Sequence, residues 1–269
     1  MSHTAFFTDV INQYLPEPHA SLLNGIIFGT KLRTSKDFIM EIKKVGLTHL
    51  VVLSGMNITI LCSIISALTA RISKKAALLI TIITILFFID FVGIQAPIVR
   101  AAFMSVLTSV ATLFGKRTVV LYTLVLSFIF CVAIWPHWLT SISFQLSYGA
   151  TLGLILFAGK EQENKTSSNI ALLSGYGKSE FRTSLAAQVF TVPLIFIYFK
   201  QLSLIAPVTN VLVSWIVTPI MIFGFITAFL GKIHYVLGII PSYICYVLLS
   251  YLILVIHWMS QLPFIFYQF

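Results

Sequence analysis

Residues 45–70 read VGLTHLVVLSGMNITILCSIISALTA, a run without any formal charge. A helix needs about 20 consecutive apolar residues to span the hydrocarbon core of a bilayer, so this run predicts a transmembrane helix. Polar side chains gather near its start, at His49, Ser54 and Asn57, with Gly55 between the last two. Because polar groups in hydrocarbon are costly unless they find partners or water, this cluster indicates a functional path or a broken helix.

Charge is scarce along the rest of the chain as well. Charged residues make up 9% of the 269 residues and hydrophobic residues 58%, a balance far outside that of soluble domains. Further uncharged runs cover residues 118–159, 201–231 and 233–269. We therefore predict an all-α polytopic membrane protein with about eight transmembrane helices. They are expected near residues 47–70, 76–94, 97–115, 118–135, 142–159, 183–199, 203–230 and 240–261.

Proline occurs within the later spans, at Pro193, Pro207, Pro219 and Pro241. Because proline removes a backbone donor and clashes with the preceding turn, these positions indicate kinked or discontinuous helices. In another predicted span, Gly149 and Gly153 have the GxxxG spacing, which by itself is a weak sign of close helix contact.

Residues 1–46 form an amphipathic lead-in, and residues 47–269 form the transmembrane domain. Within the lead-in, residues 19–28 are apolar but too few to span the bilayer. This segment therefore predicts a short interfacial or re-entrant helix.

The distribution of Lys and Arg gives an orientation. Basic residues gather in alternate loops, at Arg71, Lys74, Lys75, Lys116, Arg117, Lys160, Lys165, Lys178 and Arg182. The connections at residues 94–96 and 136–141 carry none. Because cytoplasmic loops carry the excess of Lys and Arg, we expect a multi-pass protein of the bacterial cytoplasmic (inner) membrane with both termini external.

One segment departs from this rule. Ahead of the first span, basic residues outnumber Asp37 and Glu41 on the face predicted to be external. We call them the basic rim: Lys31, Arg33, Lys36, Lys43 and Lys44. Two interpretations stay open. In the first, the orientation is inverted or residues 19–28 add a half-helix that changes the number of crossings. In the second, the rim is an external surface for an anionic substrate.

Arg100 is a second polar feature at membrane depth. It lies three residues after Pro97, and Asp90 lies four residues before Ile94 in the preceding span. A tight outer turn places the two side chains at similar depth, so one interpretation is an ion pair. The other is a guanidinium that faces a hydrated path and contacts phosphates. Both hold if the carboxylate merely orients the arginine.

The sequence argues against several kinds of enzyme. It contains no HxH, HExxH or CxxC pattern, so no metal is expected, and no GxxxxGK[ST] loop, so no nucleotide cofactor is expected. An intramembrane hydrolase with Ser54 as nucleophile and His49 or His257 as base is disfavoured. The five residues from His49 to Ser54 turn about 500° around a helix, a poor phase for a hydrogen bond. We therefore expect no catalytic residues.

Motifs along most of the chain are similar to those of a known family. In order they are LPEP at 15–18, SLLNG at 21–25, GLTHL at 46–50 with LSGMN at 53–57, PIVRAA at 97–102, FQLSY at 144–148, SLAAQ at 184–188 with Pro193, and LSL at 202–204 with Pro207, Asn210 and Pro219. The chain thereby resembles the membrane-embedded competence domain of ComEC-type DNA-internalisation proteins. The THL…SG and PxxRAA elements together are fairly specific.

The resemblance implies a channel that passes one strand of incoming DNA across the cytoplasmic membrane during natural transformation. It places nine residues on motif positions as pore or core-polar residues, without individual roles: His49, Ser54, Gly55, Asn57, Arg100, Gln145, Ser147, Gln188 and Asn210. The implied partners are single-stranded DNA, the lipid bilayer, an external DNA receptor or nuclease and a cytoplasmic motor. A second copy of the chain is a further candidate partner, because a strand needs a wide path.

The chain also departs from the family pattern. Many members add an OB-like domain before this region and a metallo-β-lactamase-like nuclease domain after it. The residues before 45 are too few for the first, and residues 262–269 hold no ligands for the second. We therefore expect strand degradation to need another protein, or the chain to be a short homologue or fragment. Tyr148 replaces a phenylalanine common in the motif.

A small-solute (anion) transporter or permease is the alternative function. Broken helices with polar residues at depth also describe transporters, although no inverted repeat is visible here. Flux of small anions without any effect on DNA uptake would favour this class.

Overall fold

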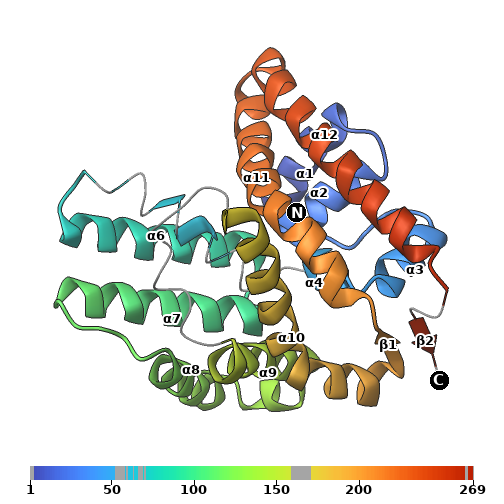
Figure 1. Cartoon of the computed structure of the whole chain (residues 1–269). Helices are drawn as coiled ribbons and strands as arrows, with labels where there is room; N and C mark the ends of the chain where they lie inside the picture. The colour runs from blue at the N-terminus through green and yellow to red at the C-terminus, as the bar shows by residue number, and fades with distance from the viewer. Residues whose placement is uncertain are drawn as a thin grey trace. The chain divides into compact units, whose positions relative to one another are not determined.

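The computed structural model describes residues 3–51, 58, 60–62, 64, 65, 69, 71–158, 171–263 and 266–268, which are mostly helical (Figure 1). Five of the described helices contain a stretch long and apolar enough to cross a membrane: α6 (Lys74–Val92), α7 (Ala96–Leu113), α10 (Ala171–Phe199), α11 (Ala206–Ile233) and α12 (Tyr235–Ser260). They confirm the all-α polytopic class. The shorter apolar helices α8 (Val120–Ile134) and α9 (Ile142–Phe157) coincide with two further predicted spans, whereas most of the span predicted at 47–70 lies outside the described residues.

Local sequence sets the ends of several helices. Ser73 and Ser141 precede α6 and α9, and each hydroxyl accepts a hydrogen bond from the N–H three residues later. Gly93 follows α6 with a φ of +100°, a conformation that side chains rarely adopt. Pro97 lies in the first turn of α7, where its missing N–H costs nothing. These residues make the tight turn between α6 and α7.

The breaks predicted at proline are only partly present. Pro207 lies in the first turn of α11, so it starts a helix instead of interrupting one. Pro193, Pro219 and Pro241 lie inside α10, α11 and α12, which continue through them. Neighbouring helices in a membrane protein can satisfy the backbone groups that an internal proline frees, which allows the helix to continue.

The described residues gather into two compact units. The first takes its residues from 1–53, 163–185 and 195–269, and the second from 54–162 and 186–194. Helix α10 therefore contributes to both. The second unit otherwise contains α6, α7, α8, the 3₁₀ helix η1 (Pro136–Thr140) and α9.

The first unit is built on α11 and α12, which are joined by the single residue His234 and pack along their length as a hairpin. Four short helical elements and two strands complete it: α1 (His3–Tyr14), α2 (His19–Phe28), α3 (Lys36–Lys44), α4 (Thr48–Val51), β1 (Gln201–Ser203) and β2 (Phe266–Gln268). The strands pair antiparallel, with Gln201 opposite Gln268. Because α1, α2 and α3 pack on the hairpin, the predicted lead-in at 1–46 is part of this unit and not a separate layer.

Helix α2 is buried. Every residue from Ala20 to Phe28 is buried, and the helix packs on both α11 and α12. An interfacial helix would expose one face, so the interfacial interpretation of residues 19–28 is wrong. A helix of ten residues that is buried among longer spans fits the re-entrant alternative.

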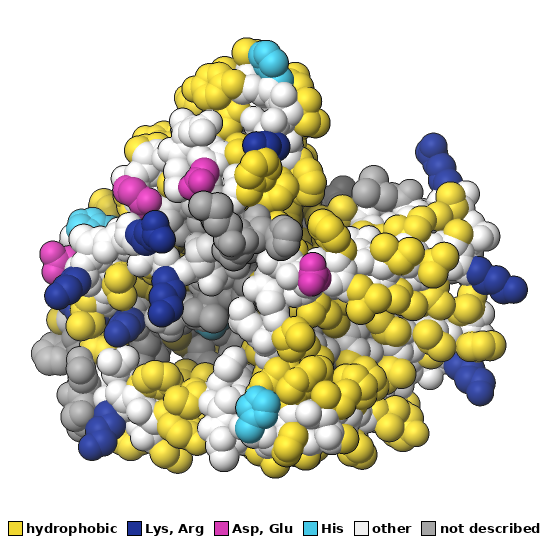
Figure 2. Space-filling view, turned by 180° about the vertical axis from the view of Figure 1, so that it is seen from behind, with side chains coloured by type: hydrophobic (Ala, Val, Ile, Leu, Met, Phe, Trp, Pro, Cys, Tyr) yellow, Lys and Arg dark blue, Asp and Glu magenta, His cyan; other side chains and the backbone are white. Residues whose placement is uncertain are grey.

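The outer surface of the described residues is strongly apolar. Phe87, Ile197 and Ile240 each expose about two thirds or more of their side chains (66%, 69% and 74%). Figure 2 shows hydrophobic side chains over much of the visible surface, with Lys and Arg in a few separate places. Exposed apolar surface of this extent is a liability in water and is expected where lipid covers it. The chain is therefore a multi-pass membrane protein.

Candidate functional site

Arg100 makes the central polar contact of the second unit. Its Nε–H donates to the Ser147 hydroxyl of α9 at 2.8 Å. Its Nη1 lies 3.5 Å from the sulfur of Met104, one turn further along α7. The Arg100 side chain is half-buried. A neutral oxygen and a weak sulfur acceptor therefore hold this cation in place.

The ion pair between Asp90 and Arg100 is not formed. Asp90 is exposed near the end of α6, and no carboxylate among the described residues lies within ion-pair distance of Arg100. Equal depth in adjacent helices does not make two side chains meet, because each must also lie on the facing side of its helix. Arg100 instead lies on the side of α7 that faces α9.

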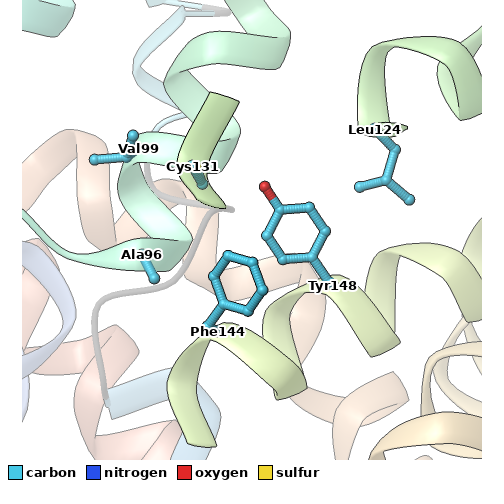
Figure 3. Close-up of a cluster of buried hydrophobic side chains, with 6 residues drawn as sticks. All are labelled: Ala96, Val99, Leu124, Cys131, Phe144 and Tyr148. Atoms are coloured by element: carbon cyan, nitrogen blue, oxygen red, sulfur yellow. The ribbon is translucent and has the colours of Figure 1, made fainter. Parts of the chain in front are cut away.

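An aromatic wall lies beside the guanidinium. The central carbon of the Arg100 guanidinium is 6.0 Å from the centroid of the Tyr148 ring, at the outer limit of a cation–π contact. Tyr148 packs on Phe144, with 4.4 Å between ring centroids. Its hydroxyl donates to the Ser127 oxygen at 3.2 Å, since Ser127 gives its own proton to a backbone carbonyl. In Figure 3 the Tyr148 hydroxyl points toward Cys131, with Phe144 beside the ring.

Two contacts of this site escaped prediction from the sequence. Met104 lies four residues after Arg100, and that helical spacing was a usable signal. Ser127 gave no signal, because serines in transmembrane helices usually bond to their own backbone. The tyrosine at position 148 thus has a partner that the phenylalanine common in the motif would lack.

The other predicted pore residues have separate partners. Gln145 donates from its side-chain amide to the carbonyl of Leu139 at 2.9 Å, which ties α9 to η1. Asn210 donates to the Ser184 hydroxyl at 2.9 Å and links α11 to α10 in the first unit. Gln188 is half-buried on α10.

His49 is exposed on α4, and its Nδ1 lies 3.1 Å from the carbonyl oxygen of Gly46. Ser54, Gly55 and Asn57 lie outside the described residues. Among the predicted pore residues that the structure describes, a direct hydrogen bond joins Arg100 to Ser147.

The corner between α3 and α4 is held by side chains that sequence reasoning missed. The carbonyl of Lys44 accepts a hydrogen bond from Ser203 at 2.7 Å, and that of Val45 accepts one from Thr209 at 2.7 Å. Gly46 follows with a φ of +75°. The corner therefore needs glycine and two hydroxyl groups from the start of α11 and the strand before it.

The basic rim lies on α3 and the segment before it. Lys31, Arg33 and Lys36 are exposed, whereas Lys43 and Lys44 are half-buried in the last turn of α3. Cations at a helix C-terminus also stabilise the helix dipole, so these two lysines have a structural role as well.

The site around Arg100 can bind but offers little for catalysis. It presents a fixed cation with several donors, which suits an anionic oxygen. Across the described residues, no three His, Cys, Asp or Glu side chains are grouped so that they could hold a metal ion.

Comparison with known proteins gives the family. A family model described as Competence protein matches residues 26–269. The chain belongs to the competence protein family. It is 25% identical over 212 residues to ComE operon protein 3 of Bacillus subtilis (strain 168), a match that covers 78% of this chain and 26% of that protein. No solved structure matches the chain.

Membership of the competence protein family confirms the resemblance seen in the motifs. It supports a role in DNA uptake during competence, with DNA as the substrate. This competence protein spans about a quarter of the length of its Bacillus relative. The match includes α2 and runs through α12, so it contains both compact units.

Proposed function

We propose that this chain provides the path by which a single DNA strand crosses the cytoplasmic membrane during natural transformation. The strongest support comes from Arg100, a cation within a spanning helix that has no carboxylate partner among the described residues. An ionisable side chain at membrane depth is costly, so an unneutralised one indicates a function.

The remaining donors of Arg100 suit a phosphate group. A guanidinium has five N–H groups; Ser147 accepts from one and the sulfur of Met104 faces a second. The other three have no acceptor among the described residues, and neither terminal nitrogen is a buried atom without a partner. They are thus accessible to an incoming group. Because Ser147 occupies Nε, the end of the fork is left for the two non-bridging oxygens of a phosphodiester.

The rest of the chain supplies the surroundings of such a path. A strand brings one phosphate per nucleotide, so its path needs water and positive or donor groups along the wall. The basic rim gathers the strand, and Arg100 contacts it within the membrane. The chain itself has no catalytic role: receptor binding, degradation of the second strand and pulling belong to other proteins.

A transformation assay tests this proposal. A deletion strain is complemented with wild type, Arg100→Gln or Arg100→Lys, and membrane levels of each protein are measured. Loss of a charge-assisted hydrogen bond costs about 1.5–3 kcal/mol, so we expect Arg100→Gln to lower transformation by about 10- to 100-fold. Arg100→Lys keeps the charge but not the fork and should be intermediate. Arg117→Gln, which removes an exposed arginine between α7 and α8, is the matched control.

Two results would count against the proposal in different ways. If the deletion strain transforms normally, the chain is no DNA path. A small-anion transporter then leads, since the same guanidinium suits a small anion, and flux of a labelled anion would be measured. If deletion abolishes transformation but Arg100→Gln restores it fully, the strand passes without contact to Arg100.

A further inference from the structure

The hairpin of α11 and α12 provides a ruler across the membrane. The helices contain 28 and 26 residues. At about 1.5 Å per residue, each is roughly 40 Å long, compared with about 30 Å for the hydrocarbon core. Contacts at the two ends of this hairpin therefore report on opposite faces of the bilayer.

Helix α1 contacts the end that carries the turn. The Tyr14 hydroxyl donates to the carbonyl of Tyr235 at 2.7 Å, and the two rings stack with 4.9 Å between centroids. The ammonium of Lys232 lies 3.3 Å from the centroid of the Phe6 ring. Lys232 belongs to the last turn of α11 and Tyr235 is the first residue of α12. Both ends of α1 thus lie at the turn.

Helix α3 contacts the other end of the hairpin. The Glu41 carboxylate lies 3.1 Å from Nδ1 of His257, in the last turn of α12. The carbonyl of Lys44 accepts from Ser203, just before α11 begins. The 22 residues from Tyr235 to His257 correspond to about 33 Å along a helix. The basic rim and α1 are therefore separated by the full thickness of the hydrocarbon core.

The chain between these helices runs through the interior of the unit. Nε2 of His19, the first residue of α2, lies 2.9 Å from the Ser250 hydroxyl, about 22 Å along α12 from its first residue. After α2 the chain turns back, because the N–H of Arg33 donates to the Ser21 hydroxyl at 2.6 Å. Residues 29–35 thus return beside α2 and lead to α3.

We propose that residues 15–35 carry the chain across the membrane, so that α1 lies on the bilayer surface at the α11–α12 turn and the basic rim lies on the opposite face. The side chains of α1 suit a lipid headgroup region: Val10 and Ile11 are buried inward, while Asp9 and Gln13 are exposed together with Phe6. This inference rests on contacts within one unit and does not depend on the proposed function.

The crossing changes the predicted orientation. Strand β2 pairs with β1, at the same end of the hairpin as α3, so it lies on the opposite face from α1. The two ends of the described chain then cannot both be external. The half-helix at 19–28 alters the number of crossings, which was one of the two open interpretations of the basic rim.

Site-directed labelling tests the crossing. In a chain whose Cys62, Cys131 and Cys245 are replaced by serine, single cysteines are introduced by Gln13→Cys in α1, Lys36→Cys in α3, Ile233→Cys at the turn and Leu262→Cys after α12. All four positions are exposed. A membrane-impermeant maleimide is applied to intact spheroplasts and to permeabilised ones. Asp9→Cys is a second position on α1, for use if Gln13→Cys lowers the protein level.

We expect two classes in intact spheroplasts. Positions 13 and 233 should share one behaviour, and positions 36 and 262 the other, with all four labelled after permeabilisation. The crossing is overturned if position 13 is labelled or protected together with position 36. It is equally overturned if positions 233 and 262 behave alike, because the hairpin then does not span the bilayer.

Discussion

Gly46 shows how much one residue can fix in this chain. It has a φ of +75°, and an added Cβ would overlap the Cβ of Ala206. Gly115 shares the positive φ, at +66°, but nothing lies within 4 Å of an added Cβ. We expect Gly115→Ala to cost about 1–2 kcal/mol from backbone strain, and Gly46→Ala to cost about 1–3 kcal/mol more from overpacking. Thermal unfolding in nanodiscs measures both, and equal losses would show that the corner does not depend on the close approach of Ala206.

At the residue scale the sequence gives residue types more readily than their partners. Arg100 stood out because a guanidinium is rare in an apolar span, and Ser147 stood out through its motif. Their hydrogen bond was not foreseen, because numbering gives the depth of a side chain but not the face of the helix on which it lies. Asp90 was chosen on depth alone and faces elsewhere. Ser203 and Thr209 were missed because such residues are common in spans.

At the scale of elements, the GxxxG pair on α9 makes the close helix contact that its spacing suggested, but the two glycines are unequal. An added Cβ on Gly153 would overlap the backbone carbonyl oxygen of Ala186 on α10, whereas one on Gly149 meets Phe190 at 3.4 Å. Replacing glycine by alanine favours a helix by about 1 kcal/mol, so Gly149→Ala should be neutral or mildly stabilising. Gly153→Ala should destabilise the protein, since backbone cannot move aside as a side chain can. Thermal unfolding compares the two, and a neutral Gly153→Ala would mean that α9 and α10 are less tightly packed.

The sequence predicted the extents of the described spans better than their surroundings. Runs without charge and serine caps locate α6, α7 and α9, because the bilayer and the backbone impose these patterns on each helix separately. The burial of α2 was out of reach. Its composition fits an interfacial helix as well as a buried one, and the choice depends on α11 and α12, which lie about 180 residues later in the chain.

At the scale of the whole molecule, charge is the property to test. Replacing Lys31, Arg33 and Lys36 by glutamine removes three exposed positive charges from the basic rim. The same change at Arg71, Lys116 and Arg117, also exposed, is a control of equal net charge. If the rim binds a strand, the slope of log affinity against log salt for a labelled single-stranded oligonucleotide should fall by about 0.7 for each phosphate that the variant no longer neutralises. Fluorescence anisotropy in nanodiscs measures it, and identical slopes in both variants would reduce the rim to a general effect of charge.

The overall class and family could be read from the sequence because both are spread over many residues. Orientation could not, because it depends on a few loop charges, and a single additional crossing reverses the sense of all of them. The charges near residues 31–44 were the visible sign of this conflict. Only the packing of α1 and α3 on a common hairpin gives the conflict a geometric explanation.

The pairing of β1 with β2 has a consequence for the order of assembly during translation. Gln201 leaves the ribosome long before Gln268, and both helices of the hairpin are synthesised in between. Strand β1 therefore waits, without its partner strand, until α11 and α12 have been synthesised, and the first unit is closed by one of its last segments to emerge. The strand pair works as a clasp that can shut only around a finished hairpin, so a ribosome that stalls before residue 266 releases a chain whose hairpin is present but unfastened.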